Sequence, residues 1–203
     1  MPEAPISARK AEIIRIAGGL FAERGFQGTS LRDIGEAVAL RRGSLYSHFS
    51  SKEEILVRLL EPAVADLREA LERAASASGT GRERLQLAMT EALRCSQGHR
   101  DAILVLFQDR QLIEDAPALH GISEQAKTIA PIWLRCITAG QGDGSIRADV
   151  APASIALGLI SLLVGALSDR HLGLYAAAGN VGDDRSELGR AATTLIFEGI
   201  TPR

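Results

Sequence analysis

A short run of cationic and hydrogen-bonding side chains lies near the start of the chain. Residues 39–52 contain three basic residues and no acidic residue. The side chains of this stretch that could bind an anion are Arg41, Arg42, Ser44, Tyr46, His48 and Lys52. Guanidinium and ammonium groups bind phosphate oxygens, and a guanidinium can also bridge two acceptors on the edge of a base. This chemistry is typical of binding to a polyanion.

The residues before this run predict a short helix with one buried face. Thr29 and Ser30 are residue types that start helices, and Asp33 lies three residues after Ser30, close to a capping-box pattern. Apolar residues then recur at helical spacing, at Leu31, Ile34, Ala37 and Val38. The pattern predicts a helix whose apolar face packs against the rest of the protein.

A second short helix is predicted over 41–49. Leu45 and Phe49 lie four residues apart and are expected to face inward. Ser51 with Glu54 forms a second capping-box pattern, which opens a longer helix. A pair of short helices of this size can present one helix to the major groove of DNA. The stretch therefore predicts a DNA-reading module.

Residues 29–54 resemble the helix-turn-helix of the tetracycline-repressor (TetR) family of bacterial regulators. The matching residues are Thr29, Ser30, Asp33, Ile34, Arg42, Gly43, Ser44, Leu45, Tyr46, His48, Phe49, Ser51, Lys52, Glu53 and Glu54. Two positions depart from the family pattern. Ala39 replaces the common glycine of the turn and is expected to carry strain if its φ is positive. Arg41 replaces a small capping residue and adds a charge beside the DNA.

The resemblance implies a role for each polar residue of the module. Arg42 is expected to reach a base edge, most naturally the O6/N7 pair of guanine, and Ser44 a base or a phosphate. Gly43 lets the backbone approach the duplex. The phosphate backbone, whose contacts set register without reading sequence, is assigned to Thr29, Arg32, Tyr46, His48 and Lys52. The alternative is that the arginines form an ordinary solvated face.

Charge is divided unevenly along the chain, whose formal net charge is −2. Residues 1–60 hold nine Lys and Arg against seven Asp and Glu, so the negative excess lies in 61–203. A mild local positive excess beside an acidic body favours orientation over general adhesion to polyanions. With few phosphate contacts per subunit, dimerisation is expected to be necessary for useful affinity on a palindromic operator of double-stranded DNA.

Composition places the protein in the cytoplasm. The hydrophobic content of 46% and charged content of 24% are typical of a soluble globular protein. No apolar run is long enough to span a bilayer, and the first ten residues lack the apolar core of a signal peptide. Two cysteines far apart in sequence, Cys95 and Cys136, indicate no disulfide framework.

The whole chain is predicted to be all-α, with a three-helix DNA-binding head over 1–52 and a larger ligand-binding and dimerisation domain over 53–203. Apolar periodicity, caps and breakers give the expected helices: Ser7–Arg24, a helix from Ser51 that is broken at 75–81, and helices near 82–97, 100–115, 122–139, 152–175 and 184–199. The glycine-rich residues 140–150 are expected to form a loop.

The helices near 152–175 and 184–199 are the expected homodimer interface. The first carries a broad apolar face, with Gly158 and Gly165 permitting close approach: Ile155, Leu159, Leu162, Leu163, Ala166 and Leu167. In the family this arrangement resembles a four-helix bundle across a two-fold axis. The alternative is that the same stripes pack inside one subunit.

By the same resemblance, the larger domain holds a small-molecule effector whose binding spreads the two heads apart. The expected mostly apolar cavity has Gln108 and Arg110 as polar contacts, and is lined by Leu60, Leu67, Ile103, Phe107, Trp133, Ile137 and Leu163. These residues would equally serve as plain core. Aromatic residues make up only 4% of the chain, which favours aliphatic or acyl ligands over flat aromatic cations. The C-terminal domain also shows a faint similarity to regulators that respond to acyl-CoA thioesters.

Pro62 interrupts the long helix that begins at Ser51 and invites a kink, which would be either a hinge for ligand transmission or a static bend. Two other classes of protein are alternatives: an enzyme, and a module that does not bind DNA. Cys95 and His99 share a helix face, but no third orienting group supports catalysis. The sequence has neither a nucleotide-binding glycine loop nor Cys and His residues at metal-ligand spacing, so no cofactor is indicated. A ligand-binding or interaction module without DNA binding would show a damaged recognition helix, and this one is intact and basic.

Overall fold

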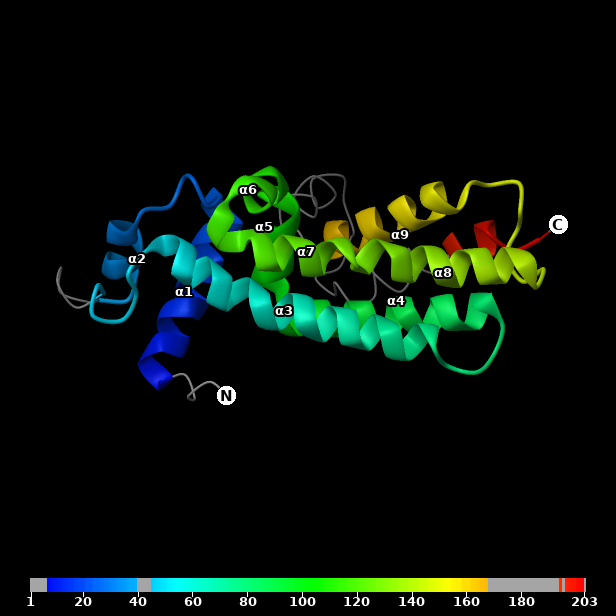
Figure 1. Ribbon diagram of the computed structural model, residues 1–203, viewed down its shortest axis with the longest axis horizontal. Helices are drawn as coiled ribbons and strands as arrows, with labels where there is room; N and C mark the ends of the chain where they lie inside the picture. The colour runs from blue at the N-terminus through cyan, green and yellow to red at the C-terminus, as the bar shows by residue number, and fades with distance from the viewer. Residues whose placement is uncertain (1–6, 40–44, 168–193, 195, 203) are drawn as a thin grey trace, which may run out of the picture. The chain divides into compact units, whose positions relative to one another are not determined.

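Helices account for the regular structure of the chain (Figure 1). The computed structural model describes residues 7–39, 45–167, 194 and 196–202, and no strand occurs among them. In chain order the helices in these ranges are α1 (Ala8–Arg24), α2 (Leu31–Ala37), α3 (Lys52–Ala75), α4 (Gly81–Gly98), α5 (Arg100–Gln108), α6 (Arg110–Asp115), the 3₁₀ helix η1 (Pro117–Leu119), α7 (His120–Lys127), α8 (Ile129–Gly142) and α9 (Pro152–Leu167).

Two predicted helices are divided in the structure. The helix expected over 100–115 breaks at Asp109 into α5 and α6, and the helix expected over 122–139 is α7 followed by α8. The end of the helix predicted near 152–175 and most of the helix predicted near 184–199 lie outside the described residues. The all-α fold class is confirmed. Within the described ranges, no helix is long and apolar enough to cross a membrane.

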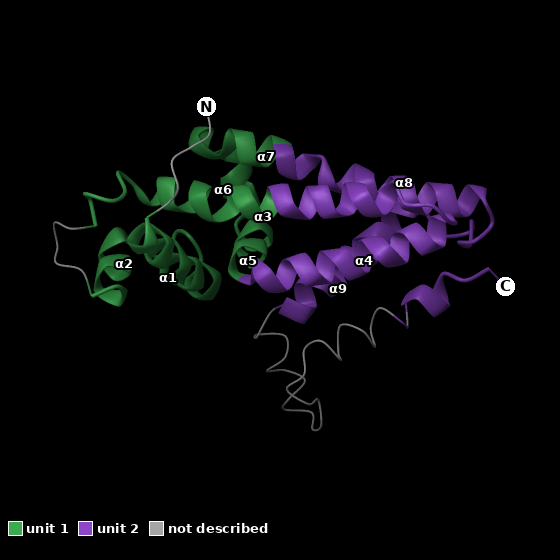
Figure 2. Cartoon of the chain, turned by 90° about the horizontal axis from the view of Figure 1, so that it is seen from below, with its two compact units in different colours: residues 1–64, 101–124 green, residues 65–100, 125–203 purple. Residues whose placement is uncertain are grey.

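The chain forms two compact units, coloured separately in Figure 2. Unit 1 comprises Met1–Val64 and Asp101–Glu124, and unit 2 comprises Ala65–Arg100 and Gln125–Arg203. This grouping differs from a division at residue 52, because unit 1 also takes the first part of α3 together with α5 and α6. Pro62 lies inside α3, two residues before the end of the first segment of unit 1. Its role as a hinge stays a prediction.

Unit 1 is built on aromatic and branched apolar side chains at the predicted spacing. Phe21 is fully buried at the end of α1, and the Phe26 ring lies 5.2 Å from it, centroid to centroid. α1 ends where expected, because Gly25 adopts φ 78° and its N–H bonds the carbonyl of Phe21 at 2.8 Å. Leu45 and Phe49 are buried, as their four-residue spacing predicts.

Helix starts in both units are fixed by reciprocal caps. In α2 the Ser30 hydroxyl accepts from the Asp33 N–H, and the Asp33 carboxylate accepts from the Ser30 N–H at 2.8 Å, which confirms the predicted box. In α4 Thr80 and Glu83 form a box of the same kind. These bonds favour the charged carboxylates, so the pKa values of Asp33 and Glu83 lie below their ordinary range.

The box predicted for α3 has a different partner. The Ser51 hydroxyl accepts from the Glu54 N–H at 3.2 Å, as predicted. The Glu54 carboxylate, however, accepts from the N–H and hydroxyl of Ser50, at 2.8 and 2.7 Å, instead of from Ser51. The return bond therefore closes one residue earlier than the sequence pattern indicates, and it lowers the pKa of Glu54.

In unit 2, α8 packs against α4 at a close backbone contact and α9 packs on both. A Cβ added at Gly81 would lie 2.0 Å from the backbone nitrogen of Gly140, so no side chain fits there. The loop predicted over 140–150 begins later, because α8 continues to Gly142, and the residues after it close the contact. Asp143 accepts from the Gly81 N–H at 2.7 Å, and the Ser145 hydroxyl accepts from the Arg82 N–H at 3.1 Å.

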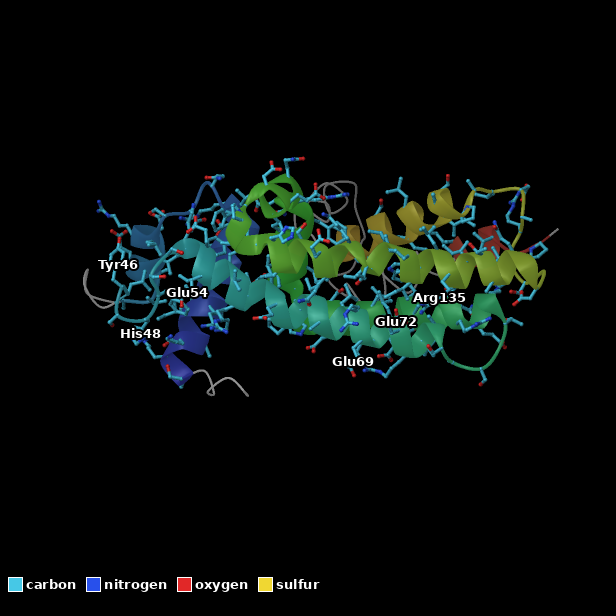
Figure 3. The ribbon with its side chains drawn as sticks, viewed as in Figure 1. Tyr46, His48, Glu54, Glu69, Glu72 and Arg135 are labelled. Atoms are coloured by element: carbon cyan, nitrogen blue, oxygen red, sulfur yellow. The ribbon has the colours of Figure 1, made fainter. Side chains whose placement is uncertain are left out.

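Three further contacts complete this end of unit 2. Arg147 donates its backbone N–H to the carbonyl of Ile200 at 2.9 Å, and the Arg82 guanidinium donates to the Thr201 hydroxyl at 2.6 Å. Glu72 and Arg135 form an ion pair that links α3 to α8 (Figure 3). The loop therefore joins α4, α8 and the C-terminal residues.

The apolar face predicted for dimerisation is packed inside the subunit. Among its members, the side chains that are at most 8% exposed in α9 are Ile155, Leu159, Leu163, Ala166 and Leu167. The surface side of α9 instead carries Leu157, which is 66% exposed, together with Ser161, Gly158 and Gly165. A Cβ added at either glycine would meet no atom within 4 Å. The burial agrees with the alternative that these stripes pack inside one subunit, and the use of this helix as a homodimer interface stays a prediction.

Replacing Gly81 by alanine is expected to destabilise the protein by about 3 kcal/mol or more, because the new methyl would overlap backbone atoms of α8. Gly98→Ala is the matched control, since it adds a methyl to the same helix in open space. Denaturant unfolding followed by circular dichroism measures both. Equal midpoints for the two variants would contradict the close contact.

Stability is also expected to fall in acid through the capping carboxylates. Folding lowers the pKa of Glu83 and of Asp143, because Thr80 donates to the first and Ser145 and Gly81 to the second. Their contribution is complete above the ordinary values of 4.5 and 3.8 and is lost as the pH falls through the lower folded-state pKa. Urea unfolding between about pH 7 and about pH 3 should give a flatter profile for Glu83→Gln and for Asp143→Asn than for wild type. Parallel profiles would refute this origin of acid sensitivity.

Candidate nucleic-acid interface

The turn after α2 holds an alanine in a conformation that glycine normally takes. α2 ends at Ala37, and the Val38 N–H bonds the carbonyl of Ile34 at 3.0 Å. Ala39 follows with φ 54°, which confirms that the departure from the family glycine carries strain. A left-handed conformation costs about 1–2 kcal/mol for a residue with a Cβ. The turn is therefore held in place by the contacts on either side of it.

Arg41, Arg42, Gly43 and Ser44 lie outside the described residues. Their assignments to base edges and phosphates stay predictions. The chain is described again from Leu45, where the His48 and Phe49 N–H groups bond the Leu45 carbonyl at 2.9 and 3.0 Å. This single helical turn keeps its two apolar residues in the core of unit 1.

Polar side chains of the same turn face solvent (Figure 3). Tyr46 is 63% exposed directly after the buried Leu45, and His48 is half-buried. An exposed tyrosine ring offers a hydroxyl donor and an apolar face, both useful against a phosphate backbone. These two placements suit the predicted contacts.

Arg32 is exposed on α2 and already has a partner. Its Nε lies 2.8 Å from a carboxylate oxygen of Glu36, one turn later on the same helix. The bond to Glu36 raises the pKa of the guanidinium, which carries its charge in any case. Exposed pairs at this spacing contribute little to stability, so a phosphate could displace Glu36 at small cost. The predicted role of Arg32 therefore requires an exchange of partners.

Two residues assigned to phosphates have internal roles. Thr29 is 1% exposed, and its hydroxyl donates to the carbonyls of Leu20 at 3.3 Å and Gly25 at 3.0 Å. The Lys52 ammonium donates to the carbonyls of Phe26 at 2.7 Å and Thr29 at 2.9 Å. It also lies 4.2 Å from the centroid of the Phe26 ring. Both side chains fix the connection between α1 and α2, and their assignment to phosphates stays a prediction that these internal bonds do not favour.

Sequence reasoning missed two basic residues that brace the module from α1. The Arg9 guanidinium donates to the carbonyl of Val38 at 2.9 Å, directly before the strained Ala39. The Lys10 ammonium lies 5.3 Å from the centroid of the Phe49 ring. A signal existed, because basic residues in the first turn of a helix oppose its dipole and need another reason to be there. Val38, which precedes the predicted recognition segment, and Phe49, at its end, are thereby both contacted from α1.

The residues assigned to an effector divide into buried and exposed groups. Those that are at most 3% exposed are Leu60 and Ile103 in unit 1, and Leu67, Trp133, Ile137 and Leu163 in unit 2. Burial is required of a core and of a ligand cavity alike, so their assignment stays a prediction. Phe107 is 40% exposed and Gln108 is exposed, because both fall on the outer side of the last turn of α5. Arg110 is likewise exposed and pairs with Glu114.

The cysteine and histidine considered for catalysis are poorly suited to it. Cys95 is buried, and this burial raises the pKa of its thiol, with the nearby Asp66 charge adding to the effect. A raised pKa keeps the thiol protonated and weakly nucleophilic. His99 bonds Asp66 at 2.8 Å and so links α4 to α3. Among the described residues, no group of three His, Cys, Asp or Glu side chains could hold a metal ion.

Comparison with known proteins gives one consistent result. Residues 13–59 match the family model described as bacterial regulatory proteins, tetR family. The chain is 31% identical over 149 residues to the HTH-type transcriptional repressor KstR2 of Mycobacterium tuberculosis, covering 71% of this chain and 72% of that protein. It is also 31% identical over 146 residues to KstR2 of Rhodococcus jostii, covering 71% of each chain.

Solved structures show the same fold. The ketosteroid transcriptional regulator KstR2 of Mycobacterium tuberculosis superposes with a TM-score of 0.83 at 22% identity, covering 98% of each chain. AibR, solved in complex with isovaleryl coenzyme A and operator DNA, superposes with a TM-score of 0.72 at 17% identity, covering 93% of this chain and 98% of that one.

The helix-turn frame of unit 1, the family match that spans it and the extended likeness to named repressors agree. They support a regulator of transcription over the enzyme class considered above. The chain belongs to the tetR family of bacterial regulatory proteins and is a DNA-binding transcriptional regulator.

Proposed function

We propose that two copies of this chain form a homodimer that represses transcription from a palindromic operator and leaves it when a small apolar or acyl-type ligand binds. The observation that carries the proposal is the pinned turn at 45–49. It leaves Tyr46 exposed, four residues after the basic Arg42 in the sequence, while Leu45 and Phe49 anchor the turn in the core. A rigidly mounted, basic and aromatic segment is what reading a duplex requires.

Within this proposal, Arg42 reads a base edge and Gly43 and Ser44 bring the backbone and a hydroxyl close to the duplex. Tyr46 and His48 hold phosphates. Thr29 and Lys52 keep their internal bonds in this proposal, which lowers the number of phosphate contacts per subunit. Because affinity for DNA grows with the number of neutralised phosphates, a second subunit becomes more necessary.

A polar group without a partner supports a ligand in unit 2. The Ser96 hydroxyl is fully buried on α4 and, unlike most buried hydroxyls, bonds no protein atom. An otherwise apolar ligand that carries a carbonyl or hydroxyl would satisfy it. The names of the related proteins favour the same class, since one is a ketosteroid regulator and another was solved with isovaleryl coenzyme A.

The proposed dimer uses the helices near 152–175 and 184–199, through the surface side of α9. Leu157 supplies apolar area, and Gly158 and Gly165 let a second helix approach closely. The last helix lies mostly outside the described residues, and its share of the interface stays a prediction.

Selection of bound duplexes from a random DNA pool tests the DNA-binding part. Wild type is expected to enrich a palindrome, and Arg42→Ala to lose about 1–3 kcal/mol of binding and to relax one position in each half-site. Arg73→Ala, which removes the same charge from an exposed pair in unit 2, is the matched control and should bind as wild type does. If the protein is folded and dimeric and still enriches no duplex, the proposal is refuted.

Dimer formation is tested with Leu157→Glu, which places a charge on the surface side of α9. Analytical ultracentrifugation at micromolar concentration should show a shift from dimer to monomer with unfolding midpoints unchanged, because Leu157 is exposed within the subunit. Leu87→Glu, on an exposed leucine of α4, is the control and should stay dimeric. A dimer that tolerates Leu157→Glu would place the interface elsewhere.

A further inference from the structure

Asp109 occupies the single residue between α5 and α6, at the position that normally caps the following helix. Its φ of −104° and ψ of 26° place it at the N-cap of α6, yet its side chain makes no capping bond. Aspartate is among the residues that cap best, so a side chain directed away from this role costs the helix a stabilising bond. The carboxylate must gain something elsewhere.

The Asp109 carboxylate reaches the connection between α1 and α2. Its Oδ2 accepts from the Phe26 N–H at 3.1 Å, across 83 positions of sequence and in a partly buried setting. An ionised acceptor makes this bond stronger than one between neutral groups. Phe26 directly follows the left-handed Gly25, and its ring is 2% exposed in the core of unit 1. The carboxylate therefore binds a backbone that already has little freedom.

The carbonyl of the same residue is bound from another helix. Lys52, the first residue of α3, donates to the Phe26 carbonyl, and its second bond reaches Thr29. Phe26 is thus held through its N–H by the α5–α6 junction and through its carbonyl by α3. The segment held in this way ends at Ser30, the cap of α2. Its position decides where α2 begins.

A second contact lies at the other end of α5. A Cβ added at Gly18 would lie 3.6 Å from the Cβ of Asp101, and one at Gly19 would lie 3.7 Å from the Asp101 carboxylate. Asp101 therefore lies against α1 beside these two glycines, at a distance that an added methyl would meet as an ordinary contact. Helix α5 therefore contacts the α1 region at both ends. Of these two contacts, the one that Asp109 makes, with Phe26, is nearer in sequence to α2.

Resting on the proposed function, we propose that Asp109 is a positioning residue for DNA binding, which fixes α2 and the turn after it by holding the Phe26 N–H from the α5–α6 junction. The link lets the conformation of α5 and α6 govern the readiness of the head to bind its operator. The Asp109–Phe26 bond differs from a bond that only stabilises its immediate surroundings, because its loss should loosen α2 without unfolding the protein.

The test compares Asp109→Ala, which removes the acceptor, with Asp109→Asn, which removes the charge and keeps an amide oxygen that can accept from Phe26. Both variants lose the same negative charge, so any general electrostatic effect on DNA binding is shared. Asp115→Ala, at the end of α6, removes a carboxylate that only accepts from Gln111 at the surface and serves as the control. All three are first checked for wild-type unfolding midpoints and dimer formation.

Hydrogen exchange read by mass spectrometry on peptides covering 25–39 comes first, because it needs no DNA. Asp109→Ala is expected to exchange on the order of tenfold faster than wild type both at Phe26 and through α2, and Asp109→Asn to stay within about twofold. Unchanged exchange, or faster exchange confined to Phe26, would overturn the proposal.

Affinity for the selected duplex comes second, at several salt concentrations. Asp109→Ala is expected to bind about three- to tenfold more weakly than Asp109→Asn, with the same slope of affinity against salt, because the phosphate contacts are unchanged and only their preorganisation is lost. Equal affinities would refute the positioning role. If wild type selects no duplex, the proposed function fails by itself, while the exchange result still decides whether Asp109 governs α2.

Discussion

The ammonium group of Lys52 holds together the segment on which the DNA-binding part of unit 1 depends. It satisfies the carbonyls of Phe26 and Thr29 and lies over the Phe26 ring. A carbonyl buried there without a donor would cost about 1–3 kcal/mol. Because Lys52 is also the first residue of α3, the start of the longest described helix and the start of α2 share one set of bonds. The turn that follows α2 inherits its position from them.

Local signals carried most of the fold. Ser30 with Asp33, Gly25 with Phe26, and the spacing of Leu45 and Phe49 act within a few residues, so the sequence alone predicted them and the structure confirms them. The break at Asp109 was missed, because it interrupts an apolar run that reads as one helix. The Asp109 side chain at this break bonds Phe26, 83 residues away, and no periodicity could indicate that partner.

The candidate site was predictable in its type and less so in its members. Residue types and spacing marked the module, but Thr29 and Lys52 are equally at home facing a phosphate or facing the carbonyls of a buried loop. Only the folded geometry decides between these partners, because both are hydrogen-bond acceptors. The same ambiguity hid Arg9, whose partner is the carbonyl of Val38. Conversely, the exposure of Tyr46 agrees with its assignment to the module, since its side chain is not part of the core.

Ala39 also bears on how this turn tolerates change. In the denatured chain an alanine samples fewer backbone conformations than a glycine, which favours folding by about 0.4–1 kcal/mol. The positive φ of Ala39 costs somewhat more than that in the folded state. The two effects partly cancel, so exchange between alanine and glycine at this position is close to neutral. Valine and isoleucine, whose Cβ atoms are branched, do not fit this positive φ. The turn therefore admits a narrow set of small residues.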